Sequence, residues 1–204
     1  GSLDVKLYYA PGTCSLAAHI ALRECGLDFE LVRVDIRQHQ LADGSDFNAI
    51  NPKGYVPVLE IGDDVRLTEV PAIVQYIADR IPESGLAPRP YTLERYQLQE
   101  WLAFISAELH KTFTPLFKPD TPEDYRLRLQ ENIATRLGYV DARLAGRNYL
   151  LGNQFTVADA YLFTILTWCN RIGMDIARWP ALLTFQERVR HRPNVREALE
   201  AEDS

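Results

Sequence analysis

Residues 51–81, NPKGYVPVLEIGDDVRLTEVPAIVQYIADRI, contain the pattern that decides the fold. The runs 58–61 and 65–68 are rich in apolar residues and are joined by Gly-Asp-Asp, which predicts an antiparallel hairpin. From Glu69 to Ile81, apolar residues recur every three or four positions, which predicts a helix with one apolar face. Pro57 stands directly before the first strand, where a residue without an N–H indicates a turn, a sheet edge or a cis peptide bond.

The residues before this segment predict the rest of a small sheet. Val5 to Ala10 and Phe29 to Asp35 read as strands, and the helical apolar spacing between them ends near Gly26, a residue typical of helix C-termini. Strand, helix and strand within about thirty residues predict a right-handed βαβ unit with parallel strands. Together with the hairpin and its helix, this unit forms a mixed sheet with helices packed against it.

A stretch rich in proline and glycine, residues 83–91, separates this half of the chain from a helical half. We therefore expect an α/β domain over 5–82, a linker over 83–91 and an all-α domain over 92–204. In the all-α domain, Thr156 and Asp159 form a capping box at the start of a helix. The helices are expected at 92–116, 122–144, 156–170, 180–191 and 193–200.

Composition limits the possible functions. The chain has 204 residues and a formal net charge of −6, without a basic stripe that would neutralise phosphates, which argues against nucleic-acid binding. No apolar run approaches the roughly 20 residues that span a bilayer, so no membrane partner is expected. The cysteines, Cys14, Cys25 and Cys169, are odd in number and widely spaced. They fit a reduced, cytoplasmic protein better than a disulfide framework or a metal site, and we expect no metal.

Cys14 follows Pro11-Gly12 at the start of the first predicted helix. The unpaired N–H groups and the dipole of a first helical turn favour negative charge, so we expect the pKa of Cys14 to be lowered. Ser15 beside it could donate a hydrogen bond to a bound sulfur. The alternative is a buried, inert cysteine that fills a gap between helix and sheet. Position alone favours neither interpretation.

Two further features suggest a ligand. If the Val56-Pro57 bond is cis, the Val56 N–H and C=O face solvent as a free edge that can pair with an extended peptide. Glu69 begins the next helix, where its carboxylate either caps the helix or binds a ligand ammonium while nearby amides hold a carboxylate. A cysteine, a free main-chain edge and such an acidic site together suit a small thiol peptide with a zwitterionic end. Glutathione is such a peptide.

At this point several stretches resemble the bacterial beta class of cytosolic glutathione transferases. They are KLYYAPGTCSLAAHIALRE, NPKGYVPVL, LTEVPAIVQYIAD, ELHKTFTPLF and FTVADAYLF, and the resemblance extends from Lys6 to the C-terminus. It implies a thioredoxin-like N-terminal domain, an all-helical C-terminal domain, a cytoplasmic homodimer with a detoxification role, and glutathione as co-substrate.

The same resemblance implies roles for residues of the first domain. Cys14 would hold glutathione as a mixed disulfide or lie against its sulfur, with Ser15 flanking that sulfur. Val56 would pair its main chain with the cysteinyl part of glutathione, before a cis Pro57. Tyr55, in the same glutathione-binding segment, replaces a frequent glutamine.

The resemblance also covers the γ-glutamyl end of glutathione and the second domain. Glu69 and Val70 would receive the γ-glutamyl group, although the position of Val70 more often carries glycine or serine. His110 and Lys111 would lie near the sulfur and the acceptor pocket. Ala103 stands where several relatives carry an asparagine, so glutathione binding could be weaker or differently posed.

Three functions remain open at this stage. The leading hypothesis is an enzyme in which glutathione thiolate attacks small hydrophobic electrophiles, with Cys14, Ser15 and His110 as catalytic residues. A second is glutathione-dependent reductive dehalogenation or thiol–disulfide exchange, in which Cys14 takes covalent part. A third is a non-catalytic binding protein that kept the fold, which Val70 and Ala103 favour. The acceptor cannot be read from the sequence, because apolar residues in the helical domain indicate only a hydrophobic pocket.

Overall fold

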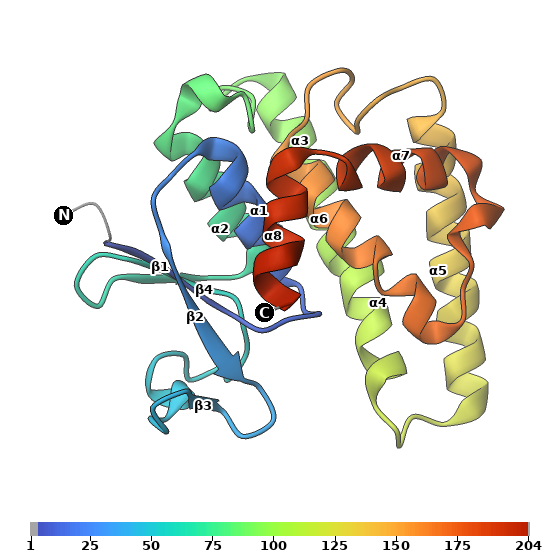
Figure 1. The fold of residues 1–204 in the computed structure, drawn as a ribbon. Coiled ribbons are helices and arrows are strands. Elements are labelled where there is room, and N and C mark those ends of the chain that lie inside the picture. The colour runs from blue at the N-terminus through green and yellow to red at the C-terminus, as the bar shows by residue number, and fades with distance from the viewer. Residues whose placement is uncertain (1–3, 204) are drawn as a thin grey trace. The chain divides into compact units, whose positions relative to one another are not determined.

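The fold was obtained as a computed structural model that describes residues 4–203 (Figure 1). Contacts divide the chain into two compact units, one formed by the described residues up to Ala87 together with those from Arg192 onward, the other by Pro88–His191. The sequence-based division placed residues 193–200 in the helical domain, because they are helical and directly follow another helix. In the structure this last helix packs on the first unit instead.

The first unit is built on a five-stranded sheet in the order β3-β2-β1-β4-β5. Leu7 of β1 lies opposite Leu31 of the parallel β2 and opposite Leu59 of the antiparallel β4, so the parallel βαβ unit is confirmed. β4 and β5 pair antiparallel, which confirms the hairpin, whereas the two-residue β3 has no clear signal in the sequence. The strands are β1 (Val5–Tyr9), β2 (Glu30–Asp35), β3 (Gln40–Leu41), β4 (Val58–Ile61) and β5 (Arg66–Thr68).

Three α-helices belong to this unit: α1 (Ser15–Cys25), α2 (Val70–Arg80) and α8 (Pro193–Asp203). α1 contacts both α2 and α8, and most of its residues are therefore buried. It ends at Gly26, whose φ of 78° lies in the left-handed region that glycine enters at low cost. Short 3-10 turns lie at Phe47–Ala49 and Pro82–Ser84.

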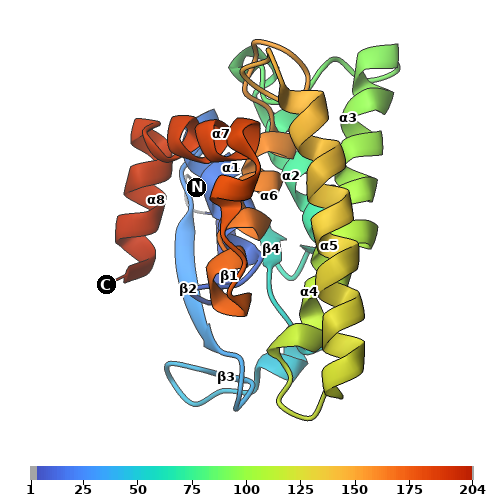
Figure 2. The same ribbon diagram turned by 90° about the vertical axis from the view of Figure 1, so that its right-hand side faces the viewer.

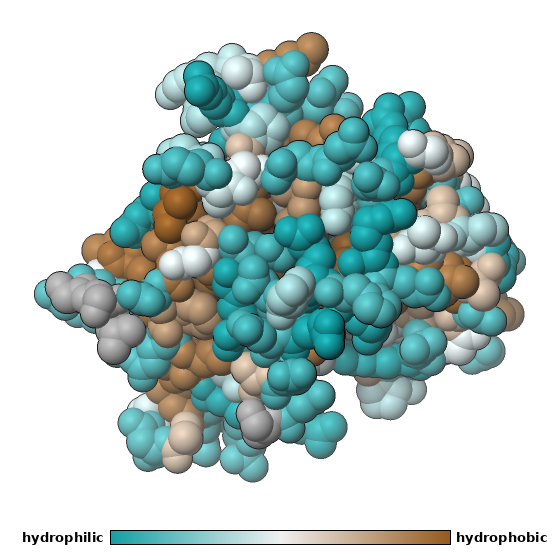
Figure 3. Space-filling view, turned by 45° about the horizontal axis from the view of Figure 1, so that its top comes forward, coloured by the Kyte–Doolittle hydropathy of each residue, from teal (hydrophilic) through white to brown (hydrophobic). Residues whose placement is uncertain are grey.

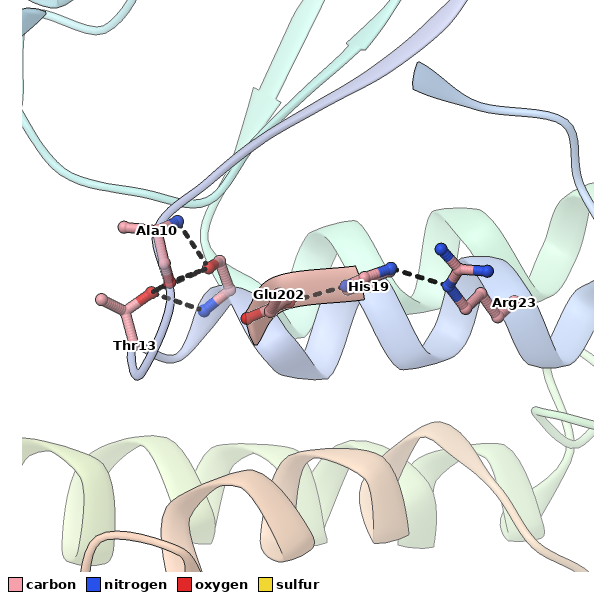
Figure 4. Close-up of polar contacts among 6 residues, drawn as sticks. Ala10, Thr13, His19, Arg23 and Glu202 are labelled. Carbon is pink, nitrogen blue, oxygen red and sulfur yellow. Dashed lines mark hydrogen bonds and ion pairs between the residues drawn. The ribbon is translucent and has the colours of Figure 1, made fainter. Parts of the chain in front are cut away.

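Polar contacts join α8 to α1 (Figure 4). His19, which is fully buried, has its Nδ1 atom 2.6 Å from Glu202 Oε2, and Arg23 Nε donates to His19 Nε2 at 2.8 Å. Because an arginine can only donate, Nε2 is the accepting nitrogen and the imidazole carries its proton on Nδ1, donating it to Glu202. Arg192 also binds both carboxylate oxygens of Glu24, at 2.7 and 3.0 Å. The C-terminal helix is thus held by directional contacts as well as by packing.

The second unit consists of helices, and Figure 2 shows the long α5 beside α4. The single helix expected over 92–116 is instead a series of helical types, because apolar periodicity does not distinguish α-helical from π-helical or 3-10 turns. Its segments are α3 (Leu93–Phe104), a π-helix (Ile105–His110), α4 (Lys111–Phe113) and a 3-10 turn (Thr114–Phe117). The other elements are α5 (Glu123–Leu144), α6 (Val157–Leu166), 3-10 turns at Cys169–Ile172 and Ile176–Arg178, and α7 (Pro180–Arg190).

The capping box of α6 is present as the sequence predicts. The Thr156 N–H donates to Asp159 Oδ2 at 2.8 Å, and the Thr156 side chain bonds the backbone of the third helical residue. The Leu150 N–H also donates to Asp159 Oδ1, at 2.9 Å, and Asp159 is fully buried. This carboxylate therefore fixes the preceding loop to the first turn of the most apolar helix of the unit.

The surface is of mixed character. On the face drawn in Figure 3, hydrophilic residues surround smaller apolar patches. None of the helices described between residues 4 and 203 is long and apolar enough to cross a membrane. Over the same residues, no group of three or more His, Cys, Asp or Glu side chains is placed to hold a metal ion.

Candidate functional site

The turn that follows β1 places Cys14 at the start of α1. Cys14 is the residue directly before the first helical residue, as the sequence predicts. Its Sγ donates to the carbonyl oxygen of Val56 over 3.5 Å, although the two residues are 42 positions apart. The Val56-Pro57 peptide bond is cis, which confirms one of the three possibilities for Pro57. The fold thus brings the cysteine and the segment before β4 together.

Val56 presents its main chain beside this thiol. Its side chain is buried in a cluster with Phe47 and Val58, which fixes the backbone in place. The carbonyl oxygen accepts from Cys14, and the Val56 N–H has no hydrogen-bond partner among residues 4–203. Val56 lies in the loop just before β4, and a main-chain donor and acceptor on one loop residue are the groups with which an extended peptide pairs.

Ser15 does not have the role expected of it. The side chain is fully buried, and its hydroxyl lies 3.2 Å from both the N–H and the C=O of Ala10 and 2.7 Å from the Thr13 hydroxyl (Figure 4). The single hydroxyl proton is used within this turn, so it is not directed at a bound sulfur. Ser15 instead stabilises the turn that positions Cys14, a local side-chain-to-backbone bond that serine and threonine commonly form.

The expected pKa shift of Cys14 is also wrong in direction. Burial raises the pKa of this thiol to about 12; its own backbone N–H lowers the value, and the negative charge of Glu69 raises it further. The first-turn amides are partly used, since Thr13 accepts from the N–H groups of both Ser15 and Leu16. The helix start therefore does not outweigh desolvation, which holds the pKa of the Cys14 thiol above its ordinary value.

Glu69 forms a polar cluster with two residues of the segment before β4. Its carboxylate oxygen Oε2 accepts from Lys53 Nζ and from the Tyr55 hydroxyl, each at 2.6 Å. The hydrogen bond to Glu69 is the largest cause of a raised pKa in both Lys53 and Tyr55. Glu69 precedes α2 with a φ of 74° and does not cap it, so the capping interpretation is wrong. The carboxylate belongs instead to a surface cluster with Lys53 and Tyr55.

Val70 is the first residue of α2, and only 3% of it is exposed. Its branched side chain is packed inside the protein, which leaves the main chain of the first helical turn as the group nearest to a ligand at Glu69. The N–H of Val70 suits a carboxylate, because a helix N-terminus carries partial positive charge, whereas the next residue, Pro71, has no N–H to offer. The concern that valine crowds a γ-glutamyl group therefore has no support in this geometry.

His110 and Lys111 lie in the second unit, where the π-helix meets α4. His110 Nδ1 is 2.6 Å from the Tyr161 hydroxyl, and the His110 ring packs against Trp168 with 5.2 Å between centroids. Lys111 is exposed. An aromatic group follows: the rings of Phe113, Phe117 and Trp168 are in mutual contact at 5.5–6.2 Å.

Several residues around these sites were not predicted from the sequence. Lys53 and Thr13 have no motif of their own, although a lysine and a glutamate flanking one hairpin are a signal for a charge pair. Tyr161 lies inside a strongly apolar helix and reads as core. His39, which has a φ of 54°, keeps a buried Nδ1 atom without a partner in the described part of the chain. This nitrogen faces the segment around Asn48 and Gly54.

Comparisons with known proteins agree with the resemblance noted in the sequence. A family model for the N-terminal domain of glutathione S-transferases matches residues 12–80, and one for their C-terminal domain matches residues 104–193. Glutathione S-transferase GstA of Escherichia coli O157:H7 is 46% identical over 198 residues, which are 97% of this chain and 98% of that protein.

Solved structures give the same result. BphK, a bacterial enzyme of this kind solved as a ternary complex, is 51% identical with a TM-score of 0.96, covering 98% of this chain and 100% of its own. A sphingomonad enzyme complexed with glutathione is 46% identical with a TM-score of 0.94, and the beta-class enzyme of Sphingomonas chungbukensis is 44% identical with a TM-score of 0.93. Each of these two covers 97% of this chain and 98% of its own. These matches confirm the two-domain fold expected from the sequence, and the chain belongs to the glutathione S-transferase family, in its bacterial beta class.

Proposed function

We propose that this protein transfers the glutathionyl group, through its sulfur, to small hydrophobic electrophiles. The observation that carries the proposal is the main chain of Val56, which presents an unpaired N–H and a carbonyl oxygen next to the thiol of Cys14. In a chain of this family, that edge is suited to the cysteinyl residue of glutathione, held in an extended conformation.

Glutathione would occupy the first unit along this edge. Its cysteinyl amide groups pair with Val56, which brings the sulfur toward Cys14 and the start of α1. Its γ-glutamyl ammonium binds the carboxylate of Glu69, and its γ-glutamyl carboxylate binds the N–H of Val70. Tyr55 and Lys53 support this end by holding Glu69 in place.

The reaction needs the thiolate of glutathione, not that of Cys14. The thiol proton leaves to solvent, the sulfur attacks an electrophilic carbon, and a C–S bond forms. A leaving group such as chloride departs with its electron pair, or an activated double bond takes the pair and then a proton from water. The family resemblance assigns His110 and Lys111, which both carry N–H donors, to stabilising the thiolate. The aromatic group of Phe113, Phe117 and Trp168 is the apolar surface of the second unit that suits a hydrophobic acceptor.

The two alternatives have less support. Thiol–disulfide exchange would use the Cys14 thiolate, which burial disfavours. A non-catalytic binding protein would follow from a blocked γ-glutamyl site, yet the Val70 side chain is buried. Cys14, Cys25 and Cys169 are all unpaired, which supports a cytoplasmic enzyme.

Calorimetric titration with glutathione tests the binding site. We expect Glu69→Gln to raise the Kd about 10-fold to 100-fold, because the ligand ammonium loses the opposite charge of its acceptor. Glu83→Gln, an exposed position in the same unit, is the matched control and should bind as the wild type does. Absence of binding heat in the wild type at millimolar glutathione would contradict the proposal, and equal affinity of Glu69→Gln would contradict the role of Glu69.

We also propose a homodimer, and its contact surface includes a groove between α3 and α5. The groove has a volume of about 330 Å³ and is lined by Trp101, Phe104, Arg136 and Tyr139, among others. The three aromatic rings contact one another at 5.5–6.1 Å, and 51% of Tyr139 is exposed. Clustered aromatic residues with arginine are the composition enriched at protein interfaces.

Light scattering after gel filtration measures the oligomeric state. Tyr139→Arg should shift the protein from dimer to monomer, because it introduces a bulky charge into an apolar contact surface. Tyr125→Arg on the same helix, at a position 48% exposed and outside the groove, should leave the dimer intact. A monomeric wild type would exclude the dimer, and a dimeric Tyr139→Arg would place the interface elsewhere.

A further inference from the structure

Asn51 is a buried residue in the turn that leads to Val56. It is 2% exposed, and its side-chain amide bonds two backbone groups of this turn. Nδ2 donates to the carbonyl oxygen of Tyr55 at 2.7 Å, and Oδ1 accepts from the N–H of Lys53 at 3.1 Å. A carbonyl can only accept and a backbone N–H can only donate, so these two partners fix the direction of both bonds and the orientation of the amide.

The main chain of Asn51 is held in the same turn. Its N–H donates to the carbonyl oxygen of Phe47 at 2.9 Å, and its C=O accepts from the N–H of Gly54 at 2.8 Å. Gly54 has a φ of 78°, and a Cβ atom there would lie 3.1 Å from His39 Cε1, so the turn is closely packed. Asn51 therefore bonds Tyr55 from a fixed position.

This bond sets the orientation of the Tyr55–Val56 peptide. The Tyr55 C=O and the Val56 N–H belong to one peptide unit, and among the described residues only the Val56-Pro57 bond is cis. In a planar trans peptide, the C=O and the N–H point in opposite directions. Because the C=O is directed at Asn51, the N–H is directed away from it, and this N–H has no hydrogen-bond partner among residues 4–203.

We propose that Asn51 is a positioning residue, which turns the Tyr55–Val56 peptide so that the Val56 N–H is presented to the cysteinyl carbonyl of glutathione. This inference rests on the proposed binding of glutathione at Val56. Asn51 acts through the peptide and not by contact with the ligand. Its loss weakens glutathione binding and leaves the chemical step unchanged, because the bond from Val56 is equally strong in the bound substrate and in the transition state.

NMR of the free protein reports on this peptide directly. Tyrosine is followed by valine only at Tyr55-Val56 and Tyr139-Val140, so carbon-13 tyrosine carbonyls and nitrogen-15 valines leave two carbonyl–amide signals, which Tyr139→Phe assigns. We expect Asn51→Ala to move the Tyr55 carbonyl signal upfield, because a carbonyl carbon that loses a hydrogen bond is more shielded, and to leave the Tyr139–Val140 signal in place. An unchanged or downfield Tyr55 signal would overturn the proposal.

Kinetics test the consequence for glutathione. With 1-chloro-2,4-dinitrobenzene as acceptor, Asn51→Ala should raise KM for glutathione about three-fold to ten-fold and leave kcat within about two-fold, the effect of one lost hydrogen bond to the bound substrate. Asn48→Ala, at an exposed asparagine of the same segment, is the matched control and should change neither the Tyr55 signal nor KM. A fall in kcat at unchanged KM contradicts the proposal.

A ligand analogue separates positioning from general damage to the site. Glutathione with a trans C=C bond in place of the cysteinyl-glycine amide has no carbonyl for the Val56 N–H. In calorimetric titrations, Asn51→Ala should weaken glutathione binding and leave the Kd of the analogue within about two-fold of its wild-type value. Equal losses for both ligands would mean that Asn51 only stabilises the fold.

A second variant serves if Asn51→Ala does not fold. Asn51→Asp keeps an oxygen that accepts from Lys53, and at pH 8, which favours the ionised carboxylate, it cannot donate to Tyr55, so the same changes are expected. If the wild type binds no glutathione, the proposed function fails, while the carbonyl signal still decides whether Asn51 orients the peptide. If glutathione binds and Asn51→Ala leaves KM unchanged, the role of Asn51 fails alone.

Discussion

Replacing Cys14 by alanine is expected to abolish the glutathione mixed disulfide and to leave conjugation largely intact. Conjugation uses the sulfur of glutathione as nucleophile, and Val56 and Glu69 hold the tripeptide without the Cys14 thiol. A mixed disulfide instead requires the Cys14 thiolate to attack oxidised glutathione, which forms one S–S bond and releases glutathione thiolate. Intact-protein mass spectrometry measures the adduct, and the conjugation rate with 1-chloro-2,4-dinitrobenzene measures transfer.

The rate of adduct formation in the wild type should depend steeply on pH. Because burial raises the pKa of Cys14 to about 12, very little of the thiol is ionised at pH 7, and the ionised fraction rises about tenfold with each pH unit below the pKa. We therefore expect adduct formation to be slow at neutral pH and about 100-fold faster at pH 9. Cys25→Ala, at a buried cysteine in the same helix, is the control and should keep the adduct. Rapid labelling at pH 7 would show that the Cys14 thiolate is present at neutral pH. Loss of conjugation in Cys14→Ala would show that Cys14 takes part in conjugation.

Replacing Glu202 by alanine is expected to lower the free energy of unfolding by about 3 kcal/mol, the lower range for removing one partner of a buried polar pair. The change leaves the Nδ1–H of the fully buried His19 without an acceptor and removes the carboxylate that balances Arg23 through the imidazole. For a chain of this size, such a loss corresponds to a fall in Tm of about 6–12 °C. Thermal and urea unfolding followed by circular dichroism measure it.

Two further variants distinguish loss of the His19–Glu202 contact from a general effect of substitutions in α8. Glu200→Ala, at an exposed position of α8, should change stability by less than about 0.5 kcal/mol. Glu202→Gln keeps an oxygen that accepts from His19 and should lose only part of the stability. Wild-type stability of Glu202→Ala would mean that packing alone fixes α8 on α1.

The sequence was sufficient for the elements that local patterns control. Period-two and helical spacing located β1, β2, the β4–β5 hairpin, α1 and α2, because each of these elements buries one face and its side chains repeat with the geometry of the backbone. Thr156 and Asp159 predicted the capping box, since both partners lie three residues apart. Pro57 drew attention to the edge at Val56 for the same local reason. The candidate site of the first unit could therefore be proposed before the fold was known.

Tertiary structure decided what depends on distant atoms. Helix position predicted a lowered pKa for Cys14, but the surrounding atoms desolvate the sulfur, and the carbonyl of Val56, 42 residues away, accepts a hydrogen bond from the thiol. No rule of sequence spacing predicts the hydrogen-bond partners of the Ser15 hydroxyl and the Glu69 carboxylate. The pairing of α8 with α1 and of Tyr161 with His110 joins residues 183 and 51 positions apart. Hydrogen-bond direction and desolvation depend on all neighbours in space, whereas a sequence pattern reports only neighbours along the chain.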